Sequence, residues 1–229
     1  MIFSLVSNRY GLVVSGKFMS DSIEELKIKA GIRACEYIES GMKIGLGTGS
    51  TVKHSIIEIG RMIREENLEI IGVPTSIETE ILAKECGIIL AELGDLDGLD
   101  LVIDGADEFD VNLNLIKGGG GALLREKIVA QSSIEMVVVA DQRKEVATLG
   151  EFPLPVEVTP FAWTETRRQL ENICPGEVVI RKNGSDNFVT DNGNYILDCH
   201  FGATIDSPED LEKSIQSLAG VAECGLFCG

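Results

Sequence analysis

Residues 101–108 read Leu-Val-Ile-Asp-Gly-Ala-Asp-Glu, and residues 115–127 read Leu-Ile-Lys-Gly-Gly-Gly-Gly-Ala-Leu-Leu-Arg-Glu-Lys. An apolar run that ends in acidic residues is typical of a buried strand of an α/β sheet, where ligands bind beyond the carboxyl ends of the strands. Charge at such an edge costs free energy unless it is paired or used. The stretch therefore predicts a small-molecule site in which Asp104 and Asp107 lie beside the bare backbone of residues 118–121.

A second glycine-rich loop, Gly-Leu-Gly-Thr-Gly-Ser-Thr at residues 45–51, follows another apolar run. It is not a dinucleotide fingerprint, because Ser50 replaces the third glycine and the next strand, ending near residues 72–76, carries no acid for a ribose. No Gly-Lys-Ser/Thr closes the loop, so it is not a P-loop either. Two interpretations remain: hydroxyls and helix N-terminal N–H groups that bind one phosphate, or a tight turn capped by Ser50.

Glu126 lies in a predicted helix directly after the four glycines, between Arg125 and Lys127. A charged helix surface would explain this pattern as well as a functional carboxylate does. The functional interpretation gains weight because the glycine run is able to bring Glu126 and Lys117 to the same pocket as Asp104.

The hydrophobic periodicity changes along the chain. In the first two thirds, short apolar runs alternate with amphipathic segments, which predicts a Rossmann-like, mostly parallel sheet with helices on both faces. Later the predicted order is β-α-β-β-α-β, the arrangement of a smaller ferredoxin-like α+β domain. We therefore assign residues 20–149, with 225–229 returning to them, to an α/β domain and residues 150–224 to an α+β domain.

Individual elements follow from the same patterns. The turn Asp-Asn-Gly-Asn at residues 191–194 predicts a hairpin over 188–199. Ser207 and Pro208 predict the N-cap and the first position of the last helix, with a capping box. Helices are predicted over residues 22–39, 51–64, 76–86, 122–131, 161–173 and 208–217, and strands over 43–46, 68–73, 88–91, 101–103, 136–140, 153–158, 177–181 and 221–224.

Residues 1–19 fit no element well. The stretch lacks the positive n-region of a signal peptide, and Asn8-Arg9 interrupts its apolar residues. A helix start with the sequence Ser-Asp-Ser appears only at residues 20–22. We expect residues 1–19 to be a poorly ordered extension or a wrongly assigned start, with Met19 as the initiator in the second case.

Composition restricts the partners. The net charge of −17, from 20 basic and 37 acidic residues among 229, argues against nucleic acid or an anionic membrane as the main partner. No apolar run approaches the roughly 20 residues needed to span a bilayer. The six cysteines are scattered in apolar runs, which favours reduced thiols, and Cys224 and Cys228 are interpreted as structural. We expect a cytoplasmic protein.

No metal site is predicted. The two histidines, His54 and His200, show no ligand spacing. The run Asp110-x-Asn112-x-Asn114 begins like a calcium loop, but Leu115 replaces the required glycine and Gly121 replaces the final glutamate. We interpret Asp110 as a solvated surface residue.

With these motifs in order along roughly residues 22–227, the chain resembles the type A ribose-5-phosphate isomerases. An aspartate pair, a lysine with four glycines, and a glutamate form a combination that is highly specific to that family. Two positions depart from the pattern: Cys224 stands where His or Asn is expected, and Gln142-Arg143 is an unusual pair before Lys144. The motifs that carry the resemblance are GLGTGST at 45–51, PTS at 74–76, DGADE at 104–108, NLIKGGGG at 114–121, LREK at 124–127 and VTDNGNYILD at 189–198.

The resemblance implies an isomerase that interconverts ribose 5-phosphate and ribulose 5-phosphate in the pentose phosphate pathway, without metal or organic cofactor, as a homodimer or homotetramer. Glu126 would be the base that moves a proton between C1 and C2. Asp104 and Asp107 would handle the sugar oxygens and ring opening, and Lys117 with nearby glycine N–H groups would stabilise the enediolate. The implied substrate-binding residues are Thr48, Gly49, Ser50, Thr51, Gly105, Ala106, Gly118, Gly119, Gly120 and, for the phosphate, Lys144.

Two other functions remain open at this point. A non-catalytic sugar-phosphate sensor would use a related α/β site, but it needs an output module, and no DNA-binding helix pair or basic stretch is visible. A coenzyme A transferase would use a glutamyl nucleophile, so acyl-coenzyme A with hydroxylamine would label Glu126. Incubation with ribose 5-phosphate and EDTA, with detection of the ketose, separates an isomerase from both.

Overall fold

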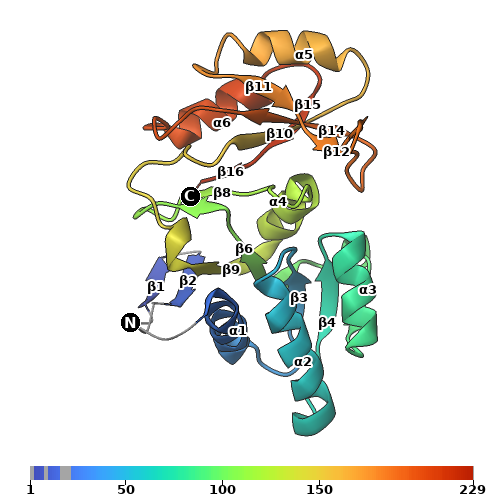
Figure 1. Ribbon diagram of the computed structural model, residues 1–229. Coiled ribbons are helices and arrows are strands. Elements are labelled where there is room, and N and C mark those ends of the chain that lie inside the picture. Colours follow the sequence, from blue (N-terminus) through green and yellow to red (C-terminus); the bar gives the residue numbers. More distant parts are fainter. Residues whose placement is uncertain (1–2, 8–9, 16–21, 229) are drawn as a thin grey trace. The chain divides into compact units, whose positions relative to one another are not determined.

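The computed structural model describes most of the chain, namely residues 3–7, 10–15 and 22–228. These residues form two compact units (Figure 1). The first unit comprises residues 1–105 and 125–144, and the second unit comprises residues 106–124 and 145–229. Each unit has its own hydrophobic core. None of the described helices combines the length and the apolar character that crossing a membrane requires.

Among the described residues, a seven-stranded sheet in the order β1-β2-β9-β6-β3-β4-β5 forms the centre of the first unit. All its strand pairs are parallel except β1 with β2, which confirms the mostly parallel sheet that the alternating pattern predicts. The strands are β1 (Phe3–Ser7), β2 (Tyr10–Ser15), β3 (Lys43–Leu46), β4 (Ile71–Pro74), β5 (Ile89–Leu90), β6 (Leu99–Gly105) and β9 (Ser133–Asp141). The helices are α1 (Ile23–Ala34), α2 (Val52–Glu66), α3 (Ile77–Glu85) and α4 (Leu123–Gln131), with short 3-10 turns at Cys35–Tyr37, Leu93–Asp95 and Gln142–Lys144.

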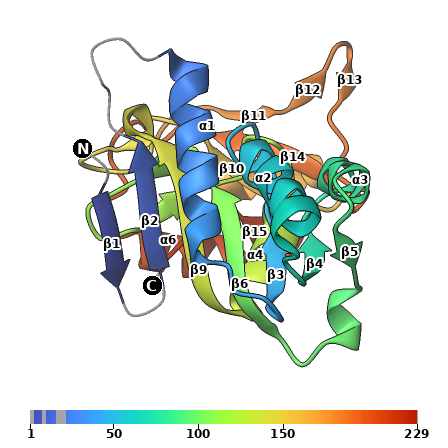
Figure 2. The same ribbon diagram turned by 90° about the horizontal axis from the view of Figure 1, so that it is seen from below.

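Side chains of β3 alternate between the two faces of this sheet. Ile44 and Leu46 face the core on the side of α1 and α2, which lie across one face of the strands (Figure 2). A Cβ on Gly45, between them, would lie 2.5 Å from a methyl group of Val129 on α4. Helices therefore cover both faces, as predicted, and Gly45 lets α4 approach the sheet closely. Burial on both faces accounts for the apolar runs in the central strands.

The two predicted helix starts are capped differently. Ser22 accepts a hydrogen bond from the Glu25 N–H, and the Glu25 side chain accepts one from the Ser22 N–H, so α1 begins with a complete capping box. The last helix begins at Pro208, as predicted, but Ser207 makes no side-chain cap bond. The capping box predicted there is therefore wrong.

Among the described residues, the second unit contains a four-stranded antiparallel sheet in the order β11-β14-β10-β15. With its two helices the chain order is β-α-β-β-α-β, which confirms the ferredoxin-like arrangement. A small sheet, β16-β8-β7, and the hairpin β12-β13 complete the unit. The elements are β7 (Glu108–Phe109), β8 (Leu115–Ile116), β10 (Leu154–Val158), α5 (Trp163–Leu170), β11 (Val178–Ile180), β12 (Lys182–Asn183), β13 (Asp186–Asn187), β14 (Tyr195–Cys199), α6 (Pro208–Gln216), β15 (Val221–Cys224) and β16 (Leu226–Phe227).

The hairpin predicted over residues 188–199 is wrong. In the described structure β14 pairs with β10 and β11, and the hairpin is β12-β13, which turns at residues 184–185. The turn at residues 191–194 still forms, and two of its asparagine side chains donate hydrogen bonds to the buried carboxylate of Glu157. An Asn-Gly signal indicates a turn, but it does not determine which strands flank it.

The compact units differ from the predicted domains at residues 106–124, 145–149 and 225–229. Residues 106–124 lie in the second unit, where β8 pairs with both β7 and β16. The chain end at β16 belongs to the same unit for the same reason. Residues 3–7 and 10–15 of the predicted extension form a hairpin, and β2 pairs with β9. Met19 lies outside the described residues, so the choice of initiator stays a prediction.

Candidate active site

The carboxyl edge of the sheet in the first unit gathers several of the predicted site residues. Strands β3, β6 and β9 are parallel neighbours, so the segments that follow them leave the sheet at the same edge. These segments are the loop of residues 47–51 after β3, Asp104 and Gly105 at the end of β6, and Lys144 shortly after β9. Open α/β sheets bind their ligands at this edge.

Asp104 is fully buried, and its carboxylate holds the loop that follows β3. Its Oδ1 atom accepts hydrogen bonds from the N–H groups of Gly105 at 2.7 Å and Thr48 at 3.2 Å. A Cβ on Gly47 would lie 2.2 Å from the same oxygen. Only glycine therefore allows the loop to pass this close to the carboxylate. Two motifs that are distant in sequence are thus joined directly.

The Thr48 side chain connects this loop to the segment that follows β4. Its hydroxyl lies 2.8 Å from the Thr75 hydroxyl and donates to Ser76 Oγ at 2.9 Å. Thr79 adds a hydrogen bond to the carbonyl of Gly47 at 2.9 Å. All three partner side chains are buried. These hydroxyls fix the shape of the loop, a role that no spacing in the sequence indicates.

The start of α2 offers hydrogen-bond donors. Thr51 is the N-cap residue and makes no side-chain cap bond, so the interpretation of this loop as a turn capped by Ser50 is wrong. Within the described residues, the hydroxyls of Ser50 and Thr51 have no hydrogen-bond partner. Ser50 and the preceding Gly49 are exposed. The N–H groups of Lys53 and His54 already donate to the carbonyls of Gly49 and Thr51. The two hydroxyls and the positive end of the helix dipole suit an anion.

Glu126 lies in the first turn of α4 and is 4% exposed. The neighbouring Lys127 is equally buried, and Arg125 is half-buried. Burial excludes the charged-surface interpretation of this stretch. The backbone dipole favours a carboxylate near a helix N-terminus, so the first turn is a favourable place for the negative form of Glu126.

The second unit holds Asp107 and Lys117. Asp107 is half-buried, and its Oδ2 atom accepts a hydrogen bond from the Gly119 N–H at 2.7 Å. Lys117 follows β8, is 2% exposed and places Nζ 5.4 Å from the centre of the Phe227 ring. Its backbone N–H donates to the Gly225 carbonyl at 2.8 Å. A buried ammonium group beside an aromatic ring is suited to stabilise a localised negative charge.

The four-glycine run requires glycine at particular positions. Gly118 and Gly121 have φ values of +103° and +83°, which side chains rarely tolerate. A Cβ on Gly121 would lie 2.5 Å from the Phe188 ring, and one on Gly119 would lie 2.6 Å from Asp107 Oδ1. Gly119 and Gly120 are exposed, so their backbone is accessible to a ligand.

Two further acidic residues of this stretch have structural roles. Glu108 is buried and accepts hydrogen bonds from two backbone N–H groups of residues 150–152. Asp110 is 9% exposed and accepts from the N–H groups of Asn112 and Asn114, so it closes its own loop. The interpretation of Asp110 as a solvated surface residue is therefore wrong.

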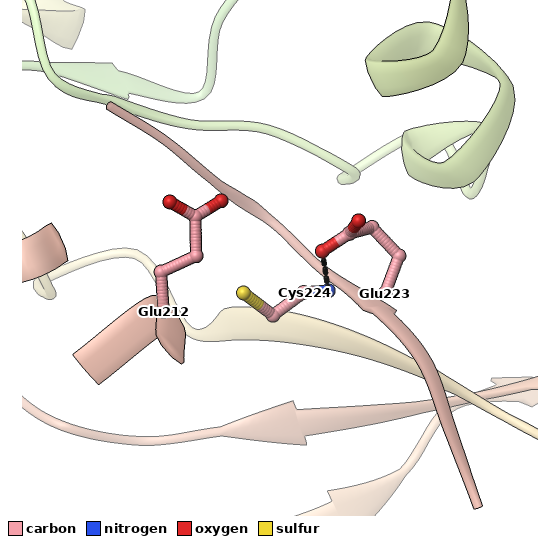
Figure 3. A group of neighbouring side chains, drawn as sticks. All are labelled: Glu212, Glu223 and Cys224. Carbon is pink, nitrogen blue, oxygen red and sulfur yellow. Dashed lines mark hydrogen bonds between the residues drawn. The ribbon is translucent and has the colours of Figure 1, made fainter. Parts of the chain in front are cut away.

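One group of metal-ligand types lies elsewhere in the second unit. Among the described residues, Glu212 of α6 and Glu223 and Cys224 of β15 place ligand atoms within 4.8 Å of one another (Figure 3). The Oε1 atom of Glu223 already accepts hydrogen bonds from the Cys224 N–H and the Gln216 amide, each at 2.7 Å. Proximity of two carboxylates and a thiol does not by itself identify an ion, and we assign none.

The chain passes between the units after Gly105, after Leu124 and after Lys144. The predicted site residues divide accordingly. The first unit contains Thr48, Gly49, Ser50, Thr51, Asp104, Gly105, Glu126 and Lys144, and the second unit contains Ala106, Asp107, Lys117, Gly118, Gly119 and Gly120. Within the units, the structure joins Asp104 to the Thr48 loop and Asp107 to the glycine run.

Comparison with known proteins places this geometry in a family. Residues 71–229 match the sequence profile of ribose 5-phosphate isomerase A (phosphoriboisomerase A). A relative named ribose-5-phosphate isomerase A from Nitrobacter hamburgensis is 51% identical over 215 residues, which cover 91% of each chain. The structure of ribose 5-phosphate isomerase A from Methanocaldococcus jannaschii has a TM-score of 0.86 at 45% identity, covering 91% of this chain and 92% of the other.

A further solved structure, a D-ribose-5-phosphate isomerase in complex with phospho-erythronic acid, has a TM-score of 0.87 at 40% identity. It covers 91% of this chain and 92% of the other. Sequence and structure agree over nearly the whole length of the relatives, which confirms the resemblance seen in the motifs. The chain belongs to the ribose 5-phosphate isomerase A family, whose members isomerise ribose 5-phosphate.

Proposed function

We propose that this ribose-5-phosphate isomerase uses Glu126 as the base that moves a proton between C2 and C1 of the open-chain substrate. The C1 carbonyl acidifies the C2 proton, and removal of that proton gives an enediolate. Return of the proton to C1, together with transfer of the hydroxyl proton from O2 to O1, gives ribulose 5-phosphate. The observation that carries the assignment is a carboxylate only 4% exposed in the first turn of α4, directly after the glycine run.

The enediolate places negative charge on an oxygen that is neutral in the aldose. Donors aimed at that oxygen stabilise the transition state more than the substrate, and this raises the rate. We assign this role to Lys117 and to the N–H groups of the glycine run. The burial of Lys117 and the accessible backbone of Gly119 and Gly120 support the assignment.

Asp104 and Asp107 are assigned to the sugar hydroxyls, where carboxylates accept and return protons during ring opening. Asp104 is fixed by backbone donors, and Asp107 is fixed by the glycine run. Gly105 and Ala106, between them, are half-buried and supply backbone groups for the sugar. Because each carboxylate is held by hydrogen bonds, each gives a sugar hydroxyl a partner in a defined position.

The phosphate is assigned to the start of α2 and to Lys144. Ser50 and Thr51 supply hydroxyls, and the backbone N–H groups of residues 49–52 precede the first N–H groups that bond within the helix start. Thr48 contributes by holding the loop. Because one relative forms a complex with phospho-erythronic acid, we propose that this compound also binds here. Its carboxylate carries negative charge as the enediolate does, so it should inhibit competitively.

Turnover of ribose 5-phosphate by purified protein treated with EDTA tests the proposed mechanism. Ketose should form at the same rate before and after chelation, because the proposed groups need no metal. Loss of activity that Mg²⁺ or Mn²⁺ restores would contradict this. Covalent labelling of Glu126 by acyl-coenzyme A and hydroxylamine would indicate a glutamyl nucleophile instead, and binding without turnover would indicate a sensor.

We also propose that the enzyme works in the cytoplasm as a homodimer or homotetramer. Light scattering of the purified protein measures the assembly, and cell fractionation measures the location. A mass equal to one chain at the concentration used in the activity assay would contradict the proposed assembly.

A further inference from the structure

Arg181, between β11 and β12, contacts the backbone of the glycine run. Its Nη1 atom donates hydrogen bonds to the carbonyl oxygens of Gly118 at 2.7 Å and Gly119 at 3.1 Å. The other side of the guanidinium forms a two-point ion pair with Asp198 of β14, with Nε donating to Oδ2 at 3.0 Å and Nη2 donating to Oδ1. The guanidinium also lies 5.9 Å from the centre of the Phe188 ring.

These contacts fix the guanidinium firmly. The Arg181 and Asp198 side chains are 15% and 20% exposed, so water competes only weakly for the ion pair. Asp198 lies within β14, the strand that pairs with both β10 and β11. The guanidinium is therefore tied to the four-stranded sheet of the second unit, while its Nη1 atom holds a loop whose glycines have little stiffness of their own.

The glycine run is held from two opposite sides. In a trans peptide the C=O and N–H groups point in opposite directions, and the described chain contains no cis peptide. The Gly118–Gly119 peptide gives its carbonyl to Arg181 and its N–H to Asp107. The next peptide also gives its carbonyl to Arg181, so the Gly120 N–H points to the side on which Asp107 lies.

The Gly120 N–H has no acceptor within the described part of the chain. It therefore remains available to a ligand on the same side as the Asp107 carboxylate. The carbonyl of the same peptide group, that of Gly119, accepts a hydrogen bond from the positively charged Arg181. This bond polarises the peptide group and makes the Gly120 N–H a stronger donor.

We propose that Arg181 is a positioning residue, which aims the Gly120 N–H at the oxygen that becomes negative in the enediolate. The proposal rests on the role assigned above to the glycine run. Arg181 itself does not touch the substrate in this proposal. It acts by setting the direction and the donor strength of one backbone group, which matters more in the transition state than in the bound substrate.

Lysine could not replace this residue fully. Its single ammonium group is able to reach either the loop carbonyls or Asp198, whereas the planar guanidinium fork serves both at once. Arg181→Lys should therefore keep the charge and the fold but lose part of the alignment.

The test compares Arg181→Ala with Arg168→Ala, a matched control in the same unit. Arg168 forms a similar two-point pair with Glu165 on α5, but both side chains are exposed. We expect kcat of Arg181→Ala to fall about 10- to 100-fold, somewhat less than the loss of a complete oxyanion donor, with KM nearly unchanged. Arg168→Ala should behave like wild type.

Chemical rescue separates positioning from general structural damage. Guanidinium ion at low, non-denaturing concentration should fill the space left in Arg181→Ala and restore part of kcat, whereas sodium chloride at the same ionic strength should not. Arg181→Lys should have an intermediate kcat and no response to guanidinium. Circular dichroism and urea unfolding establish that each variant is folded.

The proposal is overturned if Arg181→Ala keeps kcat within about twofold of wild type, since a misaligned donor costs more than that. It is equally overturned if KM rises while kcat is unchanged. Should Arg181→Ala fail to fold, Arg181→Lys decides: a wild-type kcat in that folded variant overturns the proposal. Failure of the underlying mechanism is recognised separately, because Lys117→Ala would then retain full activity.

Discussion

The backbone N–H of Thr48 donates to the Asp104 carboxylate across 3.2 Å, which connects the loop assigned to the phosphate with a residue assigned to the sugar oxygens. Asp104 is fully buried and lies near the end of the central strand β6. The positions of these two parts of the substrate site are thus interdependent. A change in the loop is transmitted directly to the carboxylate.

Gly47→Ala tests this dependence. The added Cβ would lie 2.2 Å from Asp104 Oδ1, so the loop or the carboxylate must shift. We expect kcat/KM to fall about 10²-fold, as misplacement of a reacting group by about 1 Å does, and stability to fall by about 1–3 kcal/mol. Gly94→Ala is the control, because a Cβ at that position meets no atom within 4 Å. Equal kinetics for the two variants would disprove the connection.

Lys144→Ala tests the phosphate assignment. Contact with the phosphate exists in both the ground state and the transition state, so its loss should raise KM for ribose 5-phosphate more than it lowers kcat. Free ribose should be a very poor substrate of the wild-type enzyme. Steady-state kinetics with both sugars measure these effects. Equal efficiency on ribose and ribose 5-phosphate would show that no phosphate site exists.

Asp141 should make stability depend on pH in the acid range. Its carboxylate accepts hydrogen bonds from the Arg143 guanidinium at 2.7 and 3.0 Å, and these bonds lower the pKa of Asp141 below 3.8. A carboxyl group whose pKa is lower in the folded than in the unfolded protein stabilises the fold. This stabilisation is complete above the pKa of the unfolded state and is lost as the pH falls through the pKa of the folded state. Asp141→Asn should therefore cost about 1 kcal/mol at neutral pH.

The difference between wild type and Asp141→Asn should shrink as the pH falls below about 4, where the unfolded carboxyl becomes protonated. Urea unfolding measures this stability difference at a series of pH values, down to the lowest pH at which the protein stays folded. Glu165→Gln on α5 is the control, because that carboxylate is exposed and its pair with Arg168 contributes little. A stability difference that is independent of pH would contradict the prediction.

Much of the fold could be predicted because its signals are local. The apolar runs of β3 and β6 and the capping box at Ser22 determine strand and helix positions within a few residues. The prediction of a hairpin over residues 188–199 was wrong because strand pairing is not a local property. The Asn-Gly turn is a local signal, but β14 pairs with β10 and β11, which both lie outside the predicted hairpin.

The candidate site likewise contains residues with a local sequence signal and residues without one. Asp104, Lys117 and Glu126 could be predicted as candidate site residues because charged residues interrupt apolar or glycine-rich runs, and all three are buried. Arg181 carried no such signal, since it contacts carbonyl groups that only the fold brings within hydrogen-bond distance. Contacts of a side chain with a distant backbone leave no spacing or composition pattern, so they require the structure.

Glu126→Gln is the sharpest test of the mechanism. Glutamine keeps the shape and the hydrogen-bonding reach of the side chain, but it cannot accept the C–H proton. We expect the variant to fold, to bind substrate, and to lose at least ~10²-fold in kcat, the low end of a general-base contribution. Glu85→Gln on the exposed surface of α3 is the control and should retain full activity.

Isotope exchange gives this test a second readout. A proton carried by one carboxylate exchanges with water, so wild-type turnover in D₂O should place deuterium on the carbon that receives it. Glu126→Gln should lose exchange and isomerisation together, because both require the same base. A near-wild-type kcat would place the base elsewhere, with Asp104 or Asp107 as the next candidates. Circular dichroism and substrate binding must accompany the kinetics, since only a folded variant that still binds ribose 5-phosphate identifies the missing step as proton transfer.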